Sequence, residues 1–480
     1  MVPAVRFRAD IRAARRVVFL AGLLIPGLAL AAANPVVQKS SVRMQELDRH
    51  VEADLFQPDF LVGDSNYHAL TVASDGNVHF VINTHNFDFG CRYYIFNPAT
   101  EAITLVGKLD EVLQEPAATH VPQGKVHTPL VEHQGKLWFT THTSHYHGEL
   151  PEFDSKGKAP YSGGRFMNYD LQTGQFTDVA RGVPGEGIIT MAMDTQREVL
   201  YGLTWPSGIL LTYDIAKQEM RCWGGVQGRG EWGEHPWEWD RVCRTLGVAP
   251  SGEVYGSTMY GRIWKFDPAA YNAVTYIHGL DLARLPVSQS AVETQRGDFQ
   301  YNWRVIDWNP ATKSFWGITW ETTTLFEFDP AANYLRTVDE MRPGAYRGMP
   351  RNPEISQLGF MLGPGNTLFY LAHGPEVALD GRPAAQSGLY LLTYDIQREE
   401  LTNHGPILSR DGRRVFFSES IAIGGKDEHI YTVAWVEVID PARRDEIAKA
   451  RAFGPAETAQ MVYEILLVRL PPWQRFVRGN

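Results

Sequence analysis

The stretch Phe315-Trp316-Gly317-Ile318-Thr319-Trp320 is one copy of a pattern that decides the fold of this chain. A strand of this kind opens with an apolar or aromatic pair, closes with a polar or aromatic residue and forms the second strand of a hairpin. Similar strands begin at Val78, Leu137, Leu200, Val254, Leu368 and Ile430, which makes seven copies.

A third strand follows most copies and ends in an aromatic residue plus Asp or Asn. These ends are Phe96-Asn97, Tyr169-Asp170, Tyr213-Asp214, Phe266-Asp267, Phe328-Asp329 and Tyr394-Asp395. They lie 73, 44, 53, 62 and 66 residues apart, which suits units of three or four short strands. Such units, repeated radially, are typical of a propeller. We therefore predict an all-β, seven-bladed β-propeller over residues 65–472 and a tail at 473–480.

The two ends of the chain are expected to meet in the last blade. That blade is predicted to run from Val415 to Leu470, and residues 34–64 are expected to supply its outer strand and close the ring.

The first 33 residues resemble a secretory signal in composition. Five arginines precede an apolar run at residues 17–30, and small residues follow it. This order predicts cleavage near Asn34 and a periplasmic or secreted protein. The run is short for a spanning helix, so we expect no stable membrane insertion after cleavage, with an uncleaved anchor as the alternative.

Charge and cysteine content exclude two classes of function. The 480-residue chain has 45 basic and 55 acidic residues, and its formal net charge is −10. No basic block would neutralise a row of phosphates, so a nucleic-acid partner is not expected. Three cysteines without a Cys-x-x-Cys pair do not support a thiolate metal site.

Histidines mark the candidate site. A two-residue turn at Gln134-Gly135 would place His127 directly opposite His142, with Cβ atoms about 4.5–5.5 Å apart. In a propeller, the ends of the second strands ring one mouth of the channel. That predicted ring consists of Asn83, His142, Trp205, Met259, Trp320, His373 and Trp435, with His145, Tyr146 and His147 in the loop after His142. Histidine beside tryptophan suits a sugar, because indole stacks on a pyranose and polar groups bind its edges.

Several of these residues also have a structural interpretation. Tyr201 stands at a strand position that other copies fill with Trp138 or Tyr255, so its ring is expected to pack between blades. Arg221, Arg244 and Arg304 could each be an ordinary ion-pair partner.

Four short motifs carry a resemblance to a known family: Lys125-Val126-His127-Thr128 with the following strand to His142, Tyr201 to Pro206, Tyr301-Asn302-Trp303-Arg304, and Leu325 to Pro330. Together they resemble secreted seven-bladed propeller polysaccharide lyases that cleave ulvan. The resemblance implies that His127 and one of His142 or His147 are the two histidines of the site, and that Arg221 is its arginine. Trp205 stands where the family has a tyrosine. Either the register is shifted, or Tyr146 or Tyr260 takes that role, or the specificity differs.

The residue types fit β-elimination of a uronic acid. The C5 proton becomes acidic when a cation or strong donor neutralises the adjacent carboxylate. A neutral imidazole can remove the proton, and a tyrosine or second histidine can protonate the departing 4-oxygen. We expect His127 or His142 as base, Arg221 as neutraliser, and His147 or Tyr146 as acid, acting on an acidic polysaccharide without a required cofactor. Residues expected to bind the substrate are Trp205, Tyr260, Arg304, Trp320 and His373.

Two alternatives stay open. Oligogalacturonate lyases have a similar propeller and bind a divalent metal through clustered histidines. Here Ca²⁺, Zn²⁺ or Mn²⁺ could be held, with His68 and His85 as candidate ligands beside His127, His142 and His373. The other alternative is a non-catalytic carbohydrate-binding propeller, which needs aromatic residues at the rim but no acid and base.

Overall fold

The computed structural model describes residues 42–144, 157–233, 238–270, 274–285, 301–320, 322–344, 347, 358–374, 388–452 and 462–477. All of them belong to the larger of two compact units, Pro35–Asn480. His147 and Tyr146, two predicted site residues, lie outside the described residues.

Within these described ranges, five of the sheets are four-stranded antiparallel meanders of consecutive strands. The first two contain β3 (Leu70–Val72), β4 (Val78–Ile82), β5 (Arg92–Asn97) and β6 (Ala102–Lys108), then β7 (Val131–His133), β8 (Lys136–Thr140), β9 (Arg165–Asp170) and β10 (Phe176–Arg181). The third and fourth contain β11 (Gly187–Asp194), β12 (Val199–Trp205), β13 (Ile209–Asp214) and β14 (Glu219–Gly225), then β15 (Gly247–Val248), β16 (Val254–Ser257), β17 (Arg262–Phe266) and β18 (Thr275–Asp281). The fifth contains β19 (Trp303–Asn309), β20 (Ser314–Thr319), β21 (Thr324–Asp329) and β22 (Tyr334–Glu340).

A ten-stranded sheet holds the remaining strands and joins two further meanders. The first meander is β23 (Phe360–Gly363), β24 (Thr367–His373), β25 (Leu389–Asp395) and β26 (Glu400–Ser409). The second is β27 (Val415–Ser418), β28 (Ala422–Ile423), β29 (His429–Glu437) and β30 (Tyr463–Pro472). Strand β2 (Val51–Phe56) pairs parallel with β26 and antiparallel with β30, and β1 (Arg43–Glu46) pairs parallel with β26. An N-terminal strand therefore lies beside the last strand of the chain.

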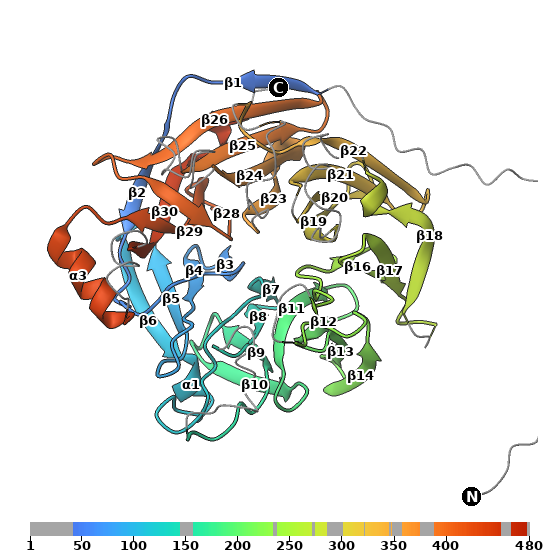
Figure 1. Ribbon diagram of the computed structural model, residues 1–480, viewed down its shortest axis with the longest axis horizontal. Helices are drawn as coiled ribbons and strands as arrows, with labels where there is room; N and C mark the ends of the chain where they lie inside the picture. Colours follow the sequence, from blue (N-terminus) through green and yellow to red (C-terminus); the bar gives the residue numbers. More distant parts are fainter. Residues whose placement is uncertain are drawn as a thin grey trace, which may run out of the picture. The chain divides into compact units, whose positions relative to one another are not determined.

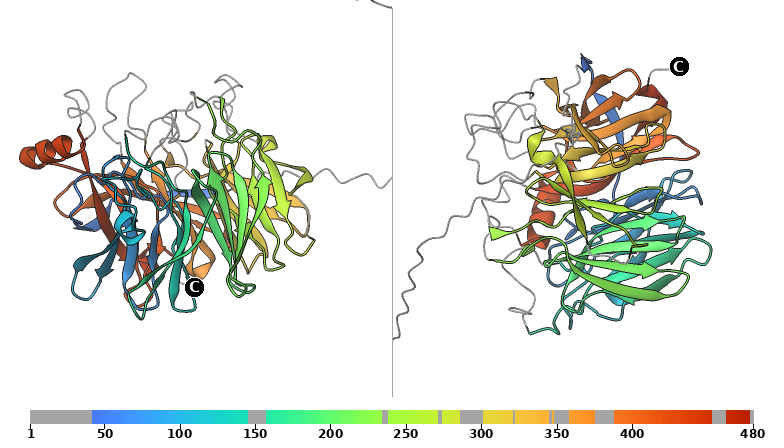
Figure 2. Two further views of the ribbon diagram at one scale, coloured as in Figure 1. Left: turned by 90° about the horizontal axis from the view of Figure 1, so that it is seen from below. Right: turned by 90° about the vertical axis from the view of Figure 1, so that its right-hand side faces the viewer.

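Figure 1 shows the sheets set radially around a common centre, with the first strand of each meander innermost. The two side views show the strands of each sheet running between the two faces of this ring (Figure 2). This is the arrangement of a β-propeller. Helices in the described residues are short: α1 (Leu109–Val112), α3 (Pro441–Ala450), and the 3₁₀ turns η2 (Leu282–Arg284), η4 (Pro364–Asn366) and η5 (Trp473–Arg475). Within these residues, no helix has the length and apolar character needed to cross a membrane.

The repeated second strands are buried because each is covered by strands of its own sheet and by neighbouring sheets. All six residues of β20 are buried, whereas β14, the outermost strand of its sheet, is mostly exposed. A glycine in the middle of several second strands makes room for an aromatic ring. A Cβ on Gly256 would come within 2.0 Å of Trp264 on the neighbouring strand β17.

The Asp or Asn that ends each third strand starts the turn to the fourth. Its side-chain oxygen accepts hydrogen bonds from backbone N–H groups two or three residues later, which holds the turn. This contact occurs at Asn97, Asp170, Asp214, Asp267, Asp329 and Asp395. The aromatic-Asp pattern in the sequence therefore has a direct structural cause.

Candidate functional site

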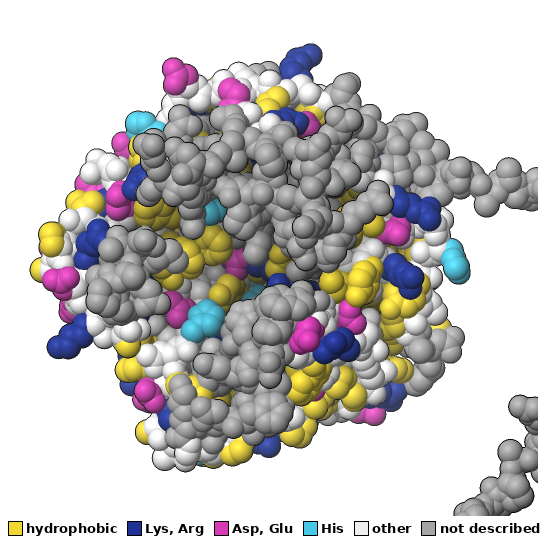
Figure 3. Space-filling view, viewed as in Figure 1, with side chains coloured by type: hydrophobic (Ala, Val, Ile, Leu, Met, Phe, Trp, Pro, Cys, Tyr) yellow, Lys and Arg dark blue, Asp and Glu magenta, His cyan; other side chains and the backbone are white. Residues whose placement is uncertain are grey.

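The candidate site lies where first strands begin and second strands end, because antiparallel pairing brings these ends together. Gly187 at the start of β11 pairs with Trp205 at the end of β12, and Trp303 of β19 pairs with Thr319 of β20. Figure 3 shows histidine and hydrophobic side chains around a hollow near the middle of the viewed face.

A chain of aromatic rings connects four of the site residues. Tyr67 stacks on His127, with ring centroids 4.4 Å apart and planes 12° from parallel. His127 meets His142 edge-on at 6.2 Å, and His142 meets Trp205 edge-on at 5.3 Å. We call Tyr67, His127 and His142 the histidine cluster. The structure therefore brings His127 and His142 together, as the sequence predicts.

The predicted pairing of these two histidines is nevertheless wrong by two residues. Lys125, and not His127, pairs with His142, through backbone hydrogen bonds of 2.8 and 3.0 Å. Val126 instead exchanges hydrogen bonds with the side-chain amide of Asn83, donating at 2.8 Å and accepting at 3.3 Å. The Thr128 hydroxyl accepts from the backbone N–H of Thr140 at 3.1 Å. Side chains thus replace the regular ladder before β7, and the register slips.

His142 is enclosed. Its side chain is fully buried, and neither ring nitrogen has a hydrogen-bond partner in the described part of the chain. The ring fits only because residue 187 is glycine: a Cβ there would lie 1.8 Å from Nδ1. Burial, followed by repulsion from Lys125, lowers the pKa of His142 well below its usual value. Burial and Arg244 do the same to the pKa of His127. Both imidazoles are therefore neutral at pH 7.

Lys125 is a site residue that sequence reasoning missed. It is completely buried, and burial lowers its pKa to about 7, with repulsion from Arg244 adding to this and attraction to Asp64 opposing it. The sequence signal that points to it is its position two residues before His127, in the same Lys125-Val126-His127-Thr128 motif.

Two buried ion pairs support the mouth. Arg304 pairs with Glu419, which follows β27 on another sheet, and the guanidinium of Arg304 lies 4.0 Å above the ring of Trp320. Arg244 pairs with Glu231 at 2.6 Å, and both side chains are fully buried. Glu231 also accepts a hydrogen bond from the indole of Trp205 at 2.9 Å.

The two predicted sugar-stacking tryptophans are therefore structural in this arrangement. Trp205 is 1% exposed and Trp320 is 4% exposed, so neither indole presents a face to solvent. Trp205 orients Glu231, and Trp320 lies against Arg304. They hold the charged groups in position beneath the mouth.

Arg221 is not part of the site. It lies on β14, the outermost strand of its sheet, and its guanidinium binds Glu219 at 3.1 and 3.2 Å. The assignment of Arg221 as carboxylate neutraliser is wrong, because the strand that carries it is farthest from the channel. Arg244 and Arg304 are the arginines that act on the histidine cluster, since the charge of each lowers the pKa of His127.

Tyr260 and His373 lie at strand ends but have different surroundings. Tyr260 is 61% exposed and donates a hydrogen bond to Asp240 at 3.0 Å, which raises the pKa of its hydroxyl. His373 ends β24 and lies edge-on to Phe417 at 5.7 Å, and burial lowers its pKa to about 4.

The two metal candidates, His68 and His85, have different surroundings. His85 binds Asp64 through Nδ1 at 2.9 Å. His68 adopts a left-handed backbone (φ 69°), and burial, reinforced by Arg304, lowers the pKa of its ring to about 4. Within the described ranges, no group of three or more His, Cys, Asp or Glu side chains is arranged to hold a metal ion.

No family model matches the chain, and no curated protein sequence matches it. A solved periplasmic gluconolactonase from Pseudomonas aeruginosa aligns with a TM-score of 0.50 at 10% identity, over 82% of this chain and 96% of that one. A protein from Lactobacillus plantarum aligns with a TM-score of 0.48 at 9% identity, over 75% and 92%. The extracellular domain of a putative hybrid two-component system from B. thetaiotaomicron aligns with a TM-score of 0.46 at 12% identity, over 80% and 38%. At these identities the likeness concerns the fold alone, and the first of these structures agrees with the propeller seen in the arrangement of the sheets.

Proposed function

We propose that this protein is an exported polysaccharide lyase that cleaves a uronic-acid-containing polysaccharide by β-elimination at the histidine cluster. The observation that carries the proposal is the parallel stack of Tyr67 on His127, 4.4 Å apart, beside a second neutral imidazole. Export rests on the arginine-rich, apolar start of the chain. We also infer seven blades, by counting the ten-stranded sheet as two blades joined through β2.

His127 is the base in this proposal. A base must be neutral at the working pH, and burial keeps its pKa below the usual range. It removes the C5 proton, the electrons of the broken C5–H bond form the C4–C5 double bond, and the C4–O bond breaks. Tyr67 donates its hydroxyl proton to the departing oxygen. Because the two rings are parallel and adjacent, base and acid approach the sugar from the same side, which fits a syn elimination.

Positive charge near the base supports the same chemistry. A carboxylate beside C5 must be neutralised before the proton can leave, and preorganised cations in a water-poor site do this effectively. Lys125, Arg244 and Arg304 all depress the pKa of His127 by their charge, so all three act on the space around it. Of these three cations, Lys125 is the one whose charge changes near pH 7, because burial lowers its pKa to about 7.

The experiment is incubation with ulvan, pectic and other uronic oligosaccharides while the absorbance of the unsaturated uronate is followed. The His127→Ala variant should lose this signal and still bind the oligosaccharide. His133→Ala is the matched control, because His133 lies on β7, the strand that follows His127, and its ring contacts Glu198 at 3.4 Å. Binding without any unsaturated product in the native protein would favour the non-catalytic sugar-binding propeller instead.

A further inference from the structure

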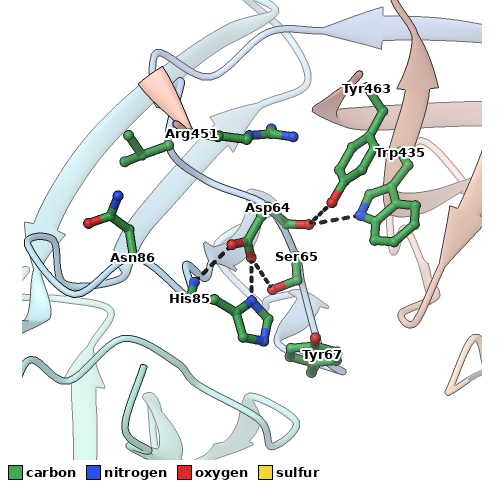
Figure 4. Close-up of a pocket in the computed structure, with 9 residues that line it drawn as sticks. Asp64, Ser65, Tyr67, His85, Asn86, Trp435, Arg451 and Tyr463 are labelled. Atoms are coloured by element: carbon green, nitrogen blue, oxygen red, sulfur yellow. Dashed lines mark hydrogen bonds and ion pairs between the residues drawn. The ribbon is translucent and has the colours of Figure 1, made fainter. Parts of the chain in front are cut away.

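A pocket of about 400 Å³ opens beside Tyr67, next to the histidine cluster. Figure 4 shows its wall: Asp64, His85 and Asn86 come from the segment around β3 and β4, whereas Trp435, Arg451 and Tyr463 come from β29, the end of α3 and β30. Tyr67 belongs both to this wall and to the stack on His127. A ligand in the pocket would therefore lie one ring away from the base.

The charge of Arg451 is attracted by Asp64 and Glu464, but the groups to which its guanidinium donates hydrogen bonds are neutral. Its Nε donates to the carbonyl of Leu61 at 3.1 Å and its Nη2 to that of Gly63 at 2.5 Å, so neutral groups fix the guanidinium. The third nitrogen, Nη1, is enclosed and has no hydrogen-bond partner in the residues that the structure describes. Burial lowers the pKa of Arg451, which expresses the cost of holding this cation away from water.

Asp64, the acidic side chain in the same pocket wall, already accepts hydrogen bonds from its neighbours. The Asp64 carboxylate accepts hydrogen bonds from the backbone N–H of His85 at 2.8 Å, from its ring at 2.9 Å and from the Ser65 hydroxyl at 2.8 Å. No ion pair between Arg451 and an acidic side chain is present in the described ranges. An anion bound in the pocket that Arg451 lines would be a direct ion-pair partner for its guanidinium.

The wall opposite Asn86 is rigid and aromatic. Trp435 and Tyr463 stack at 4.0 Å with planes 18° apart, and both donate to the backbone carbonyl of Asp64, at 2.8 and 3.3 Å. The guanidinium of Arg451 lies 4.7 Å above the Tyr463 ring. Aromatic side chains with a few fixed polar groups suit a pyranose, and a guanidinium selects a carboxylate or sulfate.

We propose that this pocket is a subsite that binds a sugar residue with an anionic substituent, carboxylate or sulfate, through Arg451. The inference rests on the proposed function, because it places this residue next to the one cleaved at His127. It goes further in assigning Arg451, a residue of the pocket wall, to the sugar beside the cleaved one. A lone uronate in an otherwise neutral chain would leave Arg451 without its partner.

The test is calorimetric titration in the His127→Ala background, where no turnover disturbs binding. The probes are a uronic oligosaccharide, its carboxyl-reduced form, and a sulfated oligosaccharide with its desulfated form. Adding Arg451→Gln should weaken binding of the acidic probes by about 10- to 100-fold, the usual range for a lost charged hydrogen bond. It should leave the neutral forms unchanged. Arg410→Gln is the control, since Arg410 is exposed and lies outside the pocket.

A second variant keeps the test valid if Arg451→Gln misfolds. Asn86→Asp adds a negative charge to the opposite wall and preserves the side-chain oxygen that accepts the N–H of Asp88 at 2.8 Å. It should weaken acidic probes relative to neutral ones. Whichever acidic probe loses affinity on neutralisation identifies carboxylate or sulfate as the anion.

Equal affinity of acidic and neutral probes, or unchanged binding in both variants, would overturn the subsite. Failure of the lyase proposal looks different: the native protein would bind acidic oligosaccharides in an Arg451-dependent way and release no unsaturated product.

Discussion

The imidazole of His127 lies almost parallel to the phenol of Tyr67, 4.4 Å away, although the two residues belong to the approaches to different sheets. Stacking fixes the ring plane of the histidine without using either of its nitrogens. Its Nδ1 is enclosed and makes no hydrogen bond within the described residues, so we assign proton abstraction to Nε2.

Tyr67→Phe separates the chemistry of this pair from its packing. The phenyl ring keeps the stack, whereas the proton donor is lost. We expect kcat to fall by about 10²- to 10⁴-fold, the usual contribution of general acid catalysis. Substrate affinity and the melting temperature should stay close to those of the native protein. A variant with full kcat would remove Tyr67 from the mechanism.

Gly187→Ala should damage His142 directly. The new Cβ would lie 1.8 Å from Nδ1, so either the ring or the start of β11 must move. Overpacking of this kind costs about 1–3 kcal/mol in the free energy of unfolding. The control is Gly425→Ala, where a Cβ meets nothing within 4 Å. Denaturant unfolding of both variants measures the difference, and equal stability would show that the site is not tightly packed.

Much of the fold could be predicted from the sequence because the residues that determine each strand and turn lie close together in the chain. The second strands repeat a buried pattern, and each terminal Asp or Asn holds its own turn, so strand positions followed from sequence alone. Tyr201, expected to pack between blades, is fully buried in a core cluster.

The site was less predictable because distant side chains decide it. The strand register at His142 depends on Asn83. This residue comes from another sheet, and its side chain accepts a hydrogen bond from the backbone N–H of Val126. The resemblance points to Arg221, but a linear motif does not distinguish an outer strand such as β14 from an inner one. Arg304 reaches its partner Glu419 across 115 positions of sequence, which no local pattern reports.

Lys125 should make stability depend on pH. Its pKa is about 7 in the folded protein and near 10.5 when exposed, so between these values the unfolded chain binds more protons. Stability contributed by this group therefore rises from pH 7 towards pH 10.5 and is constant below pH 7. Lys125→Met should remove this slope. Urea unfolding across that range gives the comparison, and an identical slope in the variant would contradict the assignment.

Loss of the Lys125 proton should lower activity, although it raises stability. If protonated Lys125 helps neutralise the substrate carboxylate, kcat/KM falls as pH rises through about 7. His127 and His142 do not add a second inflection to the kcat/KM profile near pH 7, because the pKa of each is already below its usual value. Lys125→Arg keeps the charge at all these pH values and should flatten the profile. A native profile that is flat through pH 7 would argue against a charged role for Lys125.

Variants of Arg304 and Arg221 test which of these two arginines neutralises the substrate carboxylate. Arg304→Gln removes a preorganised positive charge near the base and should lower kcat by about 10²- to 10³-fold. Because Arg304→Gln also leaves Glu419 buried without its partner, Arg304→Lys serves as a partial rescue that retains the charge and loses the planar contact with Trp320.

Arg221→Ala should change neither kcat nor stability appreciably, since its contact with Glu219 is exposed to solvent. Initial rates for the three variants, read beside their melting temperatures, distinguish the inner cation from the outer one. Reduced kcat in Arg221→Ala with native activity in Arg304→Gln would restore the assignment that the sequence first suggested.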